Sequence, residues 1–240
     1  MTSTLTVDDL RFDVVLSARR RTIELSVERN GALVVRAPER ATPERLKAFI
    51  REKRAWVYRK VAAKEALRPA APVKEFVSGE GFPYLGRSYR LLLVNAQDVP
   101  LRLEAGRFRL LRSEARQGRA HFVRWYTEHG LVWLRPRVST LARRVGVEPA
   151  GIEVRDLGYR WASCGRRGTL NFNWTSVLLP PGIVDYVIVH ELVHLRERNH
   201  TPGFWARVER AVPDYARRKA WLAEKGARAA WSAETTGSRK

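Results

Sequence analysis

Hydrophobic and polar residues alternate strictly in some stretches of the chain and follow a helical period in others. From Thr22 to Glu28 the apolar side chains fall at every second position, which is the period of a half-buried strand. Asn30-Gly31 follows and suits a tight hairpin turn, so Ala32 to Ala37 is expected to return as the partner strand. This pattern predicts a β-hairpin in the N-terminal part of the fold.

A helical period begins after Thr42-Pro43, where threonine can cap a helix and proline suits its first position. Apolar residues keep helical spacing as far as Val61, so one long helix is expected here. Pro69 to Pro72 then indicates a linker. Short strand patterns return between Phe76 and Leu111, with a turn at Ala105-Gly106.

The remaining chain predicts a long helix, a strand region and a group of helices. Ser113 to Val145 has helical spacing, and Gly130 and Pro136 are expected to bend or divide it. Strands are expected within Gly151 to Leu179, where apolar and polar residues alternate. Helices should follow from Pro181 to about Arg196, after Thr201-Pro202, and from about Asp214 to Glu224. The order predicts an α+β fold whose N-terminal half is rich in β-structure.

Composition is that of a folded protein, since 45% of the 240 residues are hydrophobic and 29% are charged. Cys164 is the only cysteine, which excludes an intramolecular disulfide. The first twelve residues contain no apolar run of the signal-peptide kind, and no stretch approaches the ~18–20 apolar residues of a membrane span. We therefore expect a cytoplasmic protein without a membrane span.

The net charge of +20 makes nucleic acid a possible partner through the basic surface. Acidic proteins and anionic lipid would be attracted by the same charge. Arginine spread over the polar sides of helices can equally reflect the base composition of a genome. The oligomeric state is left open.

His190 and His194 stand four residues apart in a largely apolar segment without proline or glycine. On a helix this spacing places both imidazoles on one face, where they can bind a single metal ion. Glu191 lies one position further round and can reach a water on that ion, whose pKa zinc lowers to ~7. Burying these residues without a cation would be costly, so a zinc site is favoured over a chance pattern.

A catalytic zinc needs a third protein ligand and one open position. His200 follows a turn at Arg198-Asn199 and is the simplest candidate, whereas Glu209 and Glu224 are weaker ones. The spacing matches metzincin peptidases, but glutamate replaces their glycine and Met1 is the only methionine, so their methionine turn is absent. Among the five histidines, His121 and His129 are expected to be ordinary residues of an amphipathic helix.

Five runs of residues match a known family: Tyr159 to Cys164, Leu170 to Trp174, Asp185 to Leu195, Asn199-His200 and Phe204-Trp205. Through these runs the chain resembles the YgjP-like metallopeptidases, small bacterial proteins related to the SprT-like zinc peptidases. The resemblance extends over nearly the whole chain, with Ala162 and Thr201 in place of the usual glycine and serine.

The resemblance implies one zinc ion on His190, His194 and His200, with Glu191 as general base. It also places the strand region beside the active helix, where a strand can pair with an extended substrate. Arg160, Trp161 and Asn173 are the candidate substrate-binding residues from this region, although a salt bridge and a core aromatic are the plainer interpretations of Arg160 and Trp161. The sequence offers four candidates for the residue that stabilises the oxyanion and does not distinguish among them: Tyr159, Tyr186, Arg160 and Tyr215.

These expectations give three regions. Residues 1–72 form a hairpin and helix region, residues 73–228 form a zincin-like helix–sheet–helix metallopeptidase domain, and residues 229–240 form a disordered tail. The expected function is a zinc peptidase acting on polypeptides. The alternatives are a DNA-associated protease acting on DNA-bound or crosslinked proteins, a nucleic-acid-binding protein with structural zinc, and a hydrolase of another amide or ester.

Overall fold

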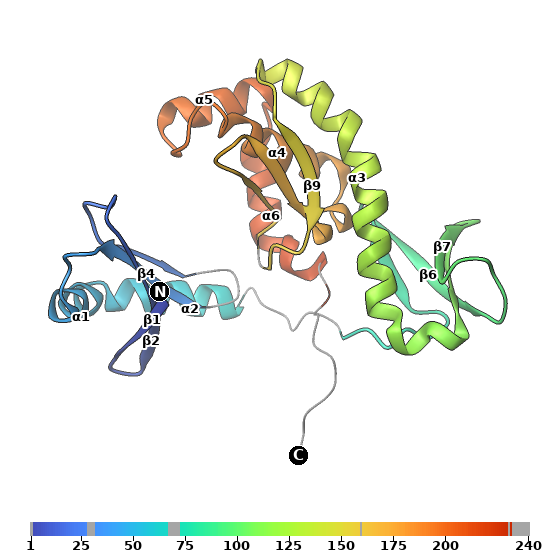
Figure 1. The fold of residues 1–240 in the computed structure, drawn as a ribbon, viewed down its shortest axis with the longest axis horizontal. Helices are drawn as coiled ribbons and strands as arrows, with labels where there is room; N and C mark the ends of the chain where they lie inside the picture. Colours follow the sequence, from blue (N-terminus) through green and yellow to red (C-terminus); the bar gives the residue numbers. More distant parts are fainter. Residues whose placement is uncertain (1, 28–31, 67–72, 159, 230, 232–240) are drawn as a thin grey trace. The chain divides into compact units, whose positions relative to one another are not determined.

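The computed structural model describes residues 2–27, 32–66, 73–158, 160–229 and 231. The chain divides into two compact units, Met1–Pro69 and Ala70–Lys240, and each combines helices with a small sheet or sheets (Figure 1). The fold is therefore α+β, as the sequence predicts. The expected hairpin turn at Asn30-Gly31 and the linker at Pro69 to Pro72 lie outside the described residues.

The N-terminal unit contains a four-stranded sheet in the order β1-β2-β4-β3. The predicted pair is present, because β3 (Glu24–Val27) runs antiparallel to β4 (Leu33–Pro38). Two strands were not expected: β1 (Thr2–Val7) is antiparallel to β2 (Leu10–Ser17), which is parallel to β4. The first strand carries few apolar residues and is rich in threonine, which suits a strand at a sheet edge.

The helix expected after Thr42 is divided into α1 (Pro43–Glu52) and α2 (Arg54–Ala66). Thr42 caps α1 as predicted, since its side-chain oxygen accepts a hydrogen bond from the Arg45 backbone N–H at 3.3 Å. The prediction of one continuous helix was wrong because Lys53 adopts a C-cap conformation, with φ of −92° and ψ of 6°. Apolar side chains from the sheet and both helices form the core of this unit, among them Phe12, Val35, Ile50 and Val57.

The second unit begins with a four-stranded sheet in the order β5-β6-β8-β7. Its strands are β5 (Gly81–Tyr84), β6 (Arg87–Val94), β7 (Leu101–Glu104) and β8 (Arg107–Leu111). Ala105 and Gly106 form the predicted turn, and both have positive φ angles, of 49° and 74°. An aromatic cluster packs on this sheet, with the rings of Phe82 and Phe122 stacked at 3.9 Å between centroids.

A short 3-10 helix, η1 (Arg112–Gln117), leads into the long helix α3 (Gly118–Val145). Of the two outcomes expected at Gly130 and Pro136, a bend or a division, the division does not occur, because both residues lie inside α3. Gly130 serves close packing instead, since a side-chain carbon added there would lie 3.1 Å from Val177. The helix ends at Gly146, which has the left-handed conformation common after helices.

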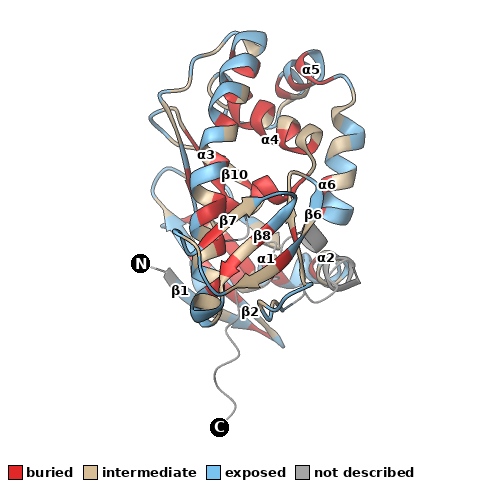
Figure 2. Ribbon diagram, turned by 90° about the vertical axis from the view of Figure 1, so that its right-hand side faces the viewer, coloured by how far each residue is buried: buried red, intermediate tan, exposed pale blue. Residues whose placement is uncertain are grey.

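A three-stranded sheet in the order β10-β11-β9 lies beside the last helices. It contains β9 (Gly151–Arg155), β10 (Ala162–Cys164) and β11 (Thr169–Asn173), and a 3-10 helix η2 (Trp174–Leu178) follows. The helices are α4 (Pro181–Val193), α5 (Pro202–Ala211) and α6 (Tyr215–Ala229). Helix α4 contacts α3, α5, α6 and β10, and most of its residues are buried (Figure 2).

The expected disordered tail needs one correction within the described residues. Trp231 is only 4% exposed, and its ring packs against Phe76, Phe82, Phe122 and Trp174. A large apolar ring gains more by entering this aromatic cluster than by remaining in water. Residues 232–240 of the expected tail lie outside the described residues. None of the helices described is both long and apolar enough to span a bilayer.

Candidate metal centre

The last turn of α4 carries the first two histidines of the site. The helix ends at Val193, earlier than the predicted end near Arg196, so His194 occupies the C-cap position. The four-residue spacing still brings the His190 and His194 rings together, with 4.9 Å between their centroids. Their support is rigid because the apolar residues of α4 are buried on nearly every side.

The turn between α4 and α5 brings the chain back beside His190 and His194. The Glu197 carbonyl lies 3.0 Å from Nδ1 of His194, and the Glu197 carboxylate accepts a hydrogen bond from the Thr201 hydroxyl at 2.9 Å. Thr201 caps α5 by accepting a hydrogen bond from the Phe204 backbone N–H at 3.2 Å. These contacts fold residues 194–201 so that His200 lies beside the other two histidines.

The three imidazoles form a nearly equilateral group. His200 lies 4.8 Å from His190 and 4.9 Å from His194 between ring centroids, and the ligand atoms of all three lie within 4.8 Å of one another. Nε2 of His190 and Nε2 of His200 are 2.9 Å apart. Two imidazoles on a tetrahedral zinc ion have nitrogens about 3.3 Å apart, so a small adjustment fits this group to one ion.

The protonation of His190 also suits metal binding. Burial, followed by the charges of His194, His200 and Lys219, lowers the pKa of His190 to about 3. The imidazole is therefore neutral at neutral pH and keeps a lone pair for a metal, as a histidine ligand must. The Glu197 carbonyl beside Nδ1 of His194 is the kind of partner that directs Nε2 of a ligand toward an ion.

Aromatic side chains surround the three histidines. The Phe204 ring lies 4.7 to 4.9 Å from each imidazole between centroids. Trp205 stacks on His200 at 5.6 Å and on Tyr215 at 5.5 Å, and the Lys219 ammonium lies 3.9 Å from the Trp205 ring centroid. The histidines are thus held by apolar walls, with one cation-π contact beside them.

Glu191 is buried directly next to the first histidine and is 8% exposed. Burial raises the pKa of Glu191 to about 7, although a hydrogen bond from the Cys164 backbone N–H and the charge of Arg160 act in the opposite direction. A carboxyl group with this pKa can both accept and release a proton near neutral pH. Cys164 belongs to β10, so the carboxylate lies near the edge strand beside α4.

The structure brings Arg160 near the site but places Trp161 and Asn173 in the core. Arg160 is exposed, and its charge reaches Glu191. Trp161 is 9% exposed, and its carbonyl accepts hydrogen bonds from the Asn173 N–H and the Ser176 hydroxyl. The Asn173 side chain is 1% exposed and donates to the carbonyls of Gly158 and Arg160 at 2.8 and 2.9 Å. Asn173 therefore holds the loop that carries Arg160.

The other candidates for charge stabilisation are spread around the site. The Tyr186 ring lies 6.0 Å from His190 between centroids, and Tyr215 reaches His200 only through Trp205. Tyr159 lies outside the described residues. Burial and the charge of Glu191 raise the pKa of Cys164, which keeps this half-buried thiol protonated, as expected of a residue without a nucleophilic role.

Several residues that surround the site or support its helix carry no recognisable signal in the sequence. Lys219 comes from α6, and its place over Trp205 depends on how two helices pack. Arg137 of α3 forms two hydrogen bonds with Asp185 of α4, at 2.5 and 2.8 Å, across 48 residues of sequence. Only the capping role of Thr201 could have been found in advance, from the Thr-Pro pair that opens α5.

Three converging imidazoles with a buried carboxyl group beside them form a site that can hold one metal ion on an α+β domain. The chain belongs to the YgjP-like metallopeptidase family, whose metallopeptidase-domain model matches residues 21–225.

Among solved structures, the chain is similar to the metallopeptidase zymogen abylysin of Pyrococcus abyssi. The two are 21% identical, the alignment covers 36% of this chain and 90% of that chain, and the TM-score is 0.34. A TM-score of this size does not show a shared fold. No curated protein matches the sequence.

Proposed function

We propose that this family member is a zinc-dependent peptidase that hydrolyses peptide bonds with the help of a glutamate. The ligands are His190, His194 and His200. Glu191 is the general base. The observation that carries the proposal is the convergence of these three imidazoles beside a buried carboxyl group.

Each side chain has a distinct task in this reaction. When bound, zinc supplies Lewis acidity that polarises the scissile carbonyl and acidifies the attacking water. The Glu191 carboxylate takes a proton from that water and later gives it to the nitrogen of the leaving amine. Its raised pKa suits both steps, because the protonated form is accessible at neutral pH. The Phe204 and Trp205 rings pack against His200 and support its position beside the other two imidazoles.

The position of β10 supports an extended polypeptide as substrate. This strand is at the edge of its sheet and contacts α4, and the backbone of its residue Cys164 lowers the pKa of Glu191. A chain that added to this edge by backbone pairing would run past the carboxylate. Arg160, whose loop is held by Asn173, would lie near the same carboxylate.

A purely structural zinc site is the less favoured function. Structural zinc usually has four protein ligands, often including several cysteines. In the described part of the chain, the group around His190 contains three histidines, and Cys164 is not part of it. Three protein ligands leave one position for a reacting group, which favours hydrolysis.

Removing and restoring the metal tests this proposal. The purified protein is dialysed against a chelator, its zinc content is measured, and cleavage of an unfolded casein-like chain is followed before and after zinc is added back. We expect cleavage to disappear with the metal and to return at about one zinc per chain. Cleavage that persists in the metal-free protein would contradict the proposal.

A further inference from the structure

The N-terminal unit contains a basic groove, which we define by Arg21, Arg40 and Arg45. It has a volume of about 560 Å³ and lies between the start of β3 and helix α1. Its apolar lining comes from Ile23, Pro38, Ala41, Ala48 and Phe49, and Thr22 and Glu52 complete it. We propose that this basic groove binds single-stranded nucleic acid. The proposal concerns a different unit from the metal centre and does not rest on the peptidase activity.

The three arginines of the basic groove have no acidic partner among the described residues, whereas Arg20 and Arg54 of the same unit do. Arg20 forms an ion pair with Glu24 at 2.5 Å, and Arg54 approaches Asp8 at 3.4 Å. Glu52, the one acidic residue of the groove, lies 2.7 Å from Lys53 instead. The guanidinium groups of the groove are exposed and available to an anion, and planar guanidinium groups bind phosphate in a bidentate manner.

The lining of the basic groove favours a ligand that combines phosphates with flat apolar rings. Phe49 is half-buried, with Ile23 and Pro38 lining the groove as well. Sites of ~300–1,000 Å³ hold small molecules, so this groove has room for about one or two nucleotides and not for a duplex. Aromatic and apolar surfaces next to arginines are the usual means of binding single strands, because every base can stack.

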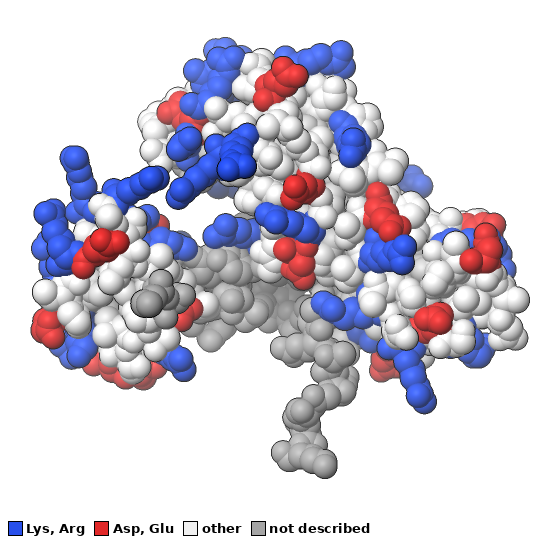
Figure 3. All heavy atoms as spheres, in the orientation of Figure 1, with Lys and Arg blue, Asp and Glu red and all other residues white. Residues whose placement is uncertain are grey.

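The charge of the whole chain favours nucleic acid over an acidic peptide. Residues 1–69 contain sixteen Lys and Arg against nine Asp and Glu, and the rest of the chain is also strongly positive, within a net charge of +20. Basic side chains are spread over the visible surface of both units (Figure 3). A polymer with one phosphate per residue can use this distributed charge along its length, whereas an acidic peptide rarely carries charge so regularly.

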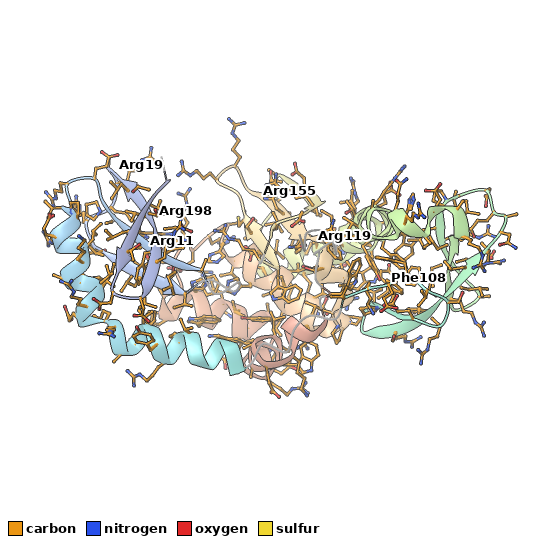
Figure 4. The ribbon with its side chains drawn as sticks, turned by 90° about the horizontal axis from the view of Figure 1, so that it is seen from below. Arg11, Arg19, Phe108, Arg119, Arg155 and Arg198 are labelled. Carbon is orange, nitrogen blue, oxygen red and sulfur yellow. The ribbon has the colours of Figure 1, made fainter. Side chains whose placement is uncertain are left out.

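Two double variants with the same change in charge test the proposal. R40A/R45A removes two arginines of the basic groove. R11A/R19A removes two exposed arginines of the same unit that do not line it, both labelled in Figure 4. Binding of a fluorescein-labelled oligo-dT of about 15 nucleotides to the full chain is measured by anisotropy over a range of salt concentrations. A labelled poly-glutamate peptide of equal charge is the competing probe, and thermal unfolding confirms that both variants fold.

We expect R40A/R45A to bind the oligonucleotide about tenfold more weakly, and R11A/R19A to stay within about twofold of the wild type. The slope of log K against log salt concentration should become shallower by about 1.4 in R40A/R45A alone. Each lost phosphate contact contributes about 0.7 to this slope for single strands, and the variant loses two contacts. No binding by the wild type would overturn the proposal. Equal losses of oligonucleotide affinity in both variants would show that the basic groove is not the binding site. If poly-glutamate binding depended on Arg40 and Arg45 as strongly as oligonucleotide binding does, the ligand would be an acidic peptide and the proposal would be wrong.

Discussion

Nε2 of His190 and Nε2 of His200 lie 2.9 Å apart, although ten residues and a helix end separate them in the chain. Two ring nitrogens approach so closely when they share a proton or face the same ion. The second explanation accounts for the nearby position of His194 as well, because all three histidines place ligand atoms within 4.8 Å of one another.

His200→Ala should therefore lower zinc affinity at least about a hundredfold, because a three-ligand site becomes a two-ligand site. Competition with a chromophoric chelator measures this affinity. His129→Ala is the matched control: His129 is exposed on α3 and stacks on Trp125 at 3.9 Å, outside the triad. Equal zinc affinities of the two variants would show that His200 is not a ligand.

The raised pKa of Glu191 predicts how the metal-free protein responds to pH. Its value of about 7 exceeds the ordinary 4.5, so the unfolded chain loses this proton first as the pH rises. The free energy of unfolding should fall between about pH 4.5 and 7, by at most roughly 3 kcal/mol. Glu191→Gln removes the buried charge, and the metal-free variant should be more stable than the wild type at about pH 8.

Urea unfolding of both metal-free proteins across this pH range measures the difference. Glu209→Gln, at an exposed carboxylate of α5, is the control and should retain the pH dependence of the wild type. A Glu191→Gln variant that is less stable than the wild type at pH 8 would show that burying the ionised Glu191 carboxylate does not destabilise the metal-free protein.

Asn173 should matter for stability and not for the metal. Its buried amide donates to two carbonyls, and its oxygen accepts a hydrogen bond from the Thr175 N–H at 3.2 Å. Asn173→Ala leaves these backbone groups unpaired and should cost about 2–4 kcal/mol in urea unfolding, with zinc still bound. Asn171→Ala is a matched control in the same strand, because its contacts of 3.4 and 3.5 Å are longer. Equal losses of unfolding free energy in the two variants would show that the Asn173 hydrogen bonds stabilise the fold no more than those of Asn171.

The Arg137–Asp185 ion pair should couple α3 to the helix that carries the metal ligands. The pair is bidentate and Asp185 is mostly buried, with its side chain 17% exposed. A double-mutant cycle with Arg137→Met and Asp185→Asn should give a coupling free energy of roughly 1–2 kcal/mol. The exposed pair Arg124–Glu128 on α3 should give only a few tenths. A coupling free energy at Arg137–Asp185 no larger than at Arg124–Glu128 would show that the Arg137–Asp185 pair does not couple α3 to α4.

The features that the sequence predicts well are those encoded within a few neighbouring residues. Thr42 and Thr201 cap helices through local hydrogen bonds, and both precede a proline that suits the first turn. The alternation of apolar and polar residues on either side of Asn30 predicts two strands, and β3 and β4 pair as expected. The spacing of His190 and His194 likewise needs only one turn of helix.

Features that depend on distant parts of the chain were not predicted. The parallel pairing of β2 with β4 and the contact of Lys219 with Trp205 arise only when separate elements pack together. The basic groove unites Arg21, Arg40 and Arg45 in the same way. Gly130 lies inside an undivided α3 for a related reason: its close packing against Val177 of η2 outweighs its low helix propensity.

The measurement that tests the central proposal most directly compares zinc content and peptide turnover in the wild type and in Glu191→Gln. The substitution keeps the size of the side chain and leaves the three histidines unchanged, so both proteins should bind about one zinc per chain. Turnover should fall at least about a hundredfold in the variant, because no carboxylate takes the proton from water. A variant that binds zinc and cleaves peptides at the wild-type rate would show that Glu191 is not the general base.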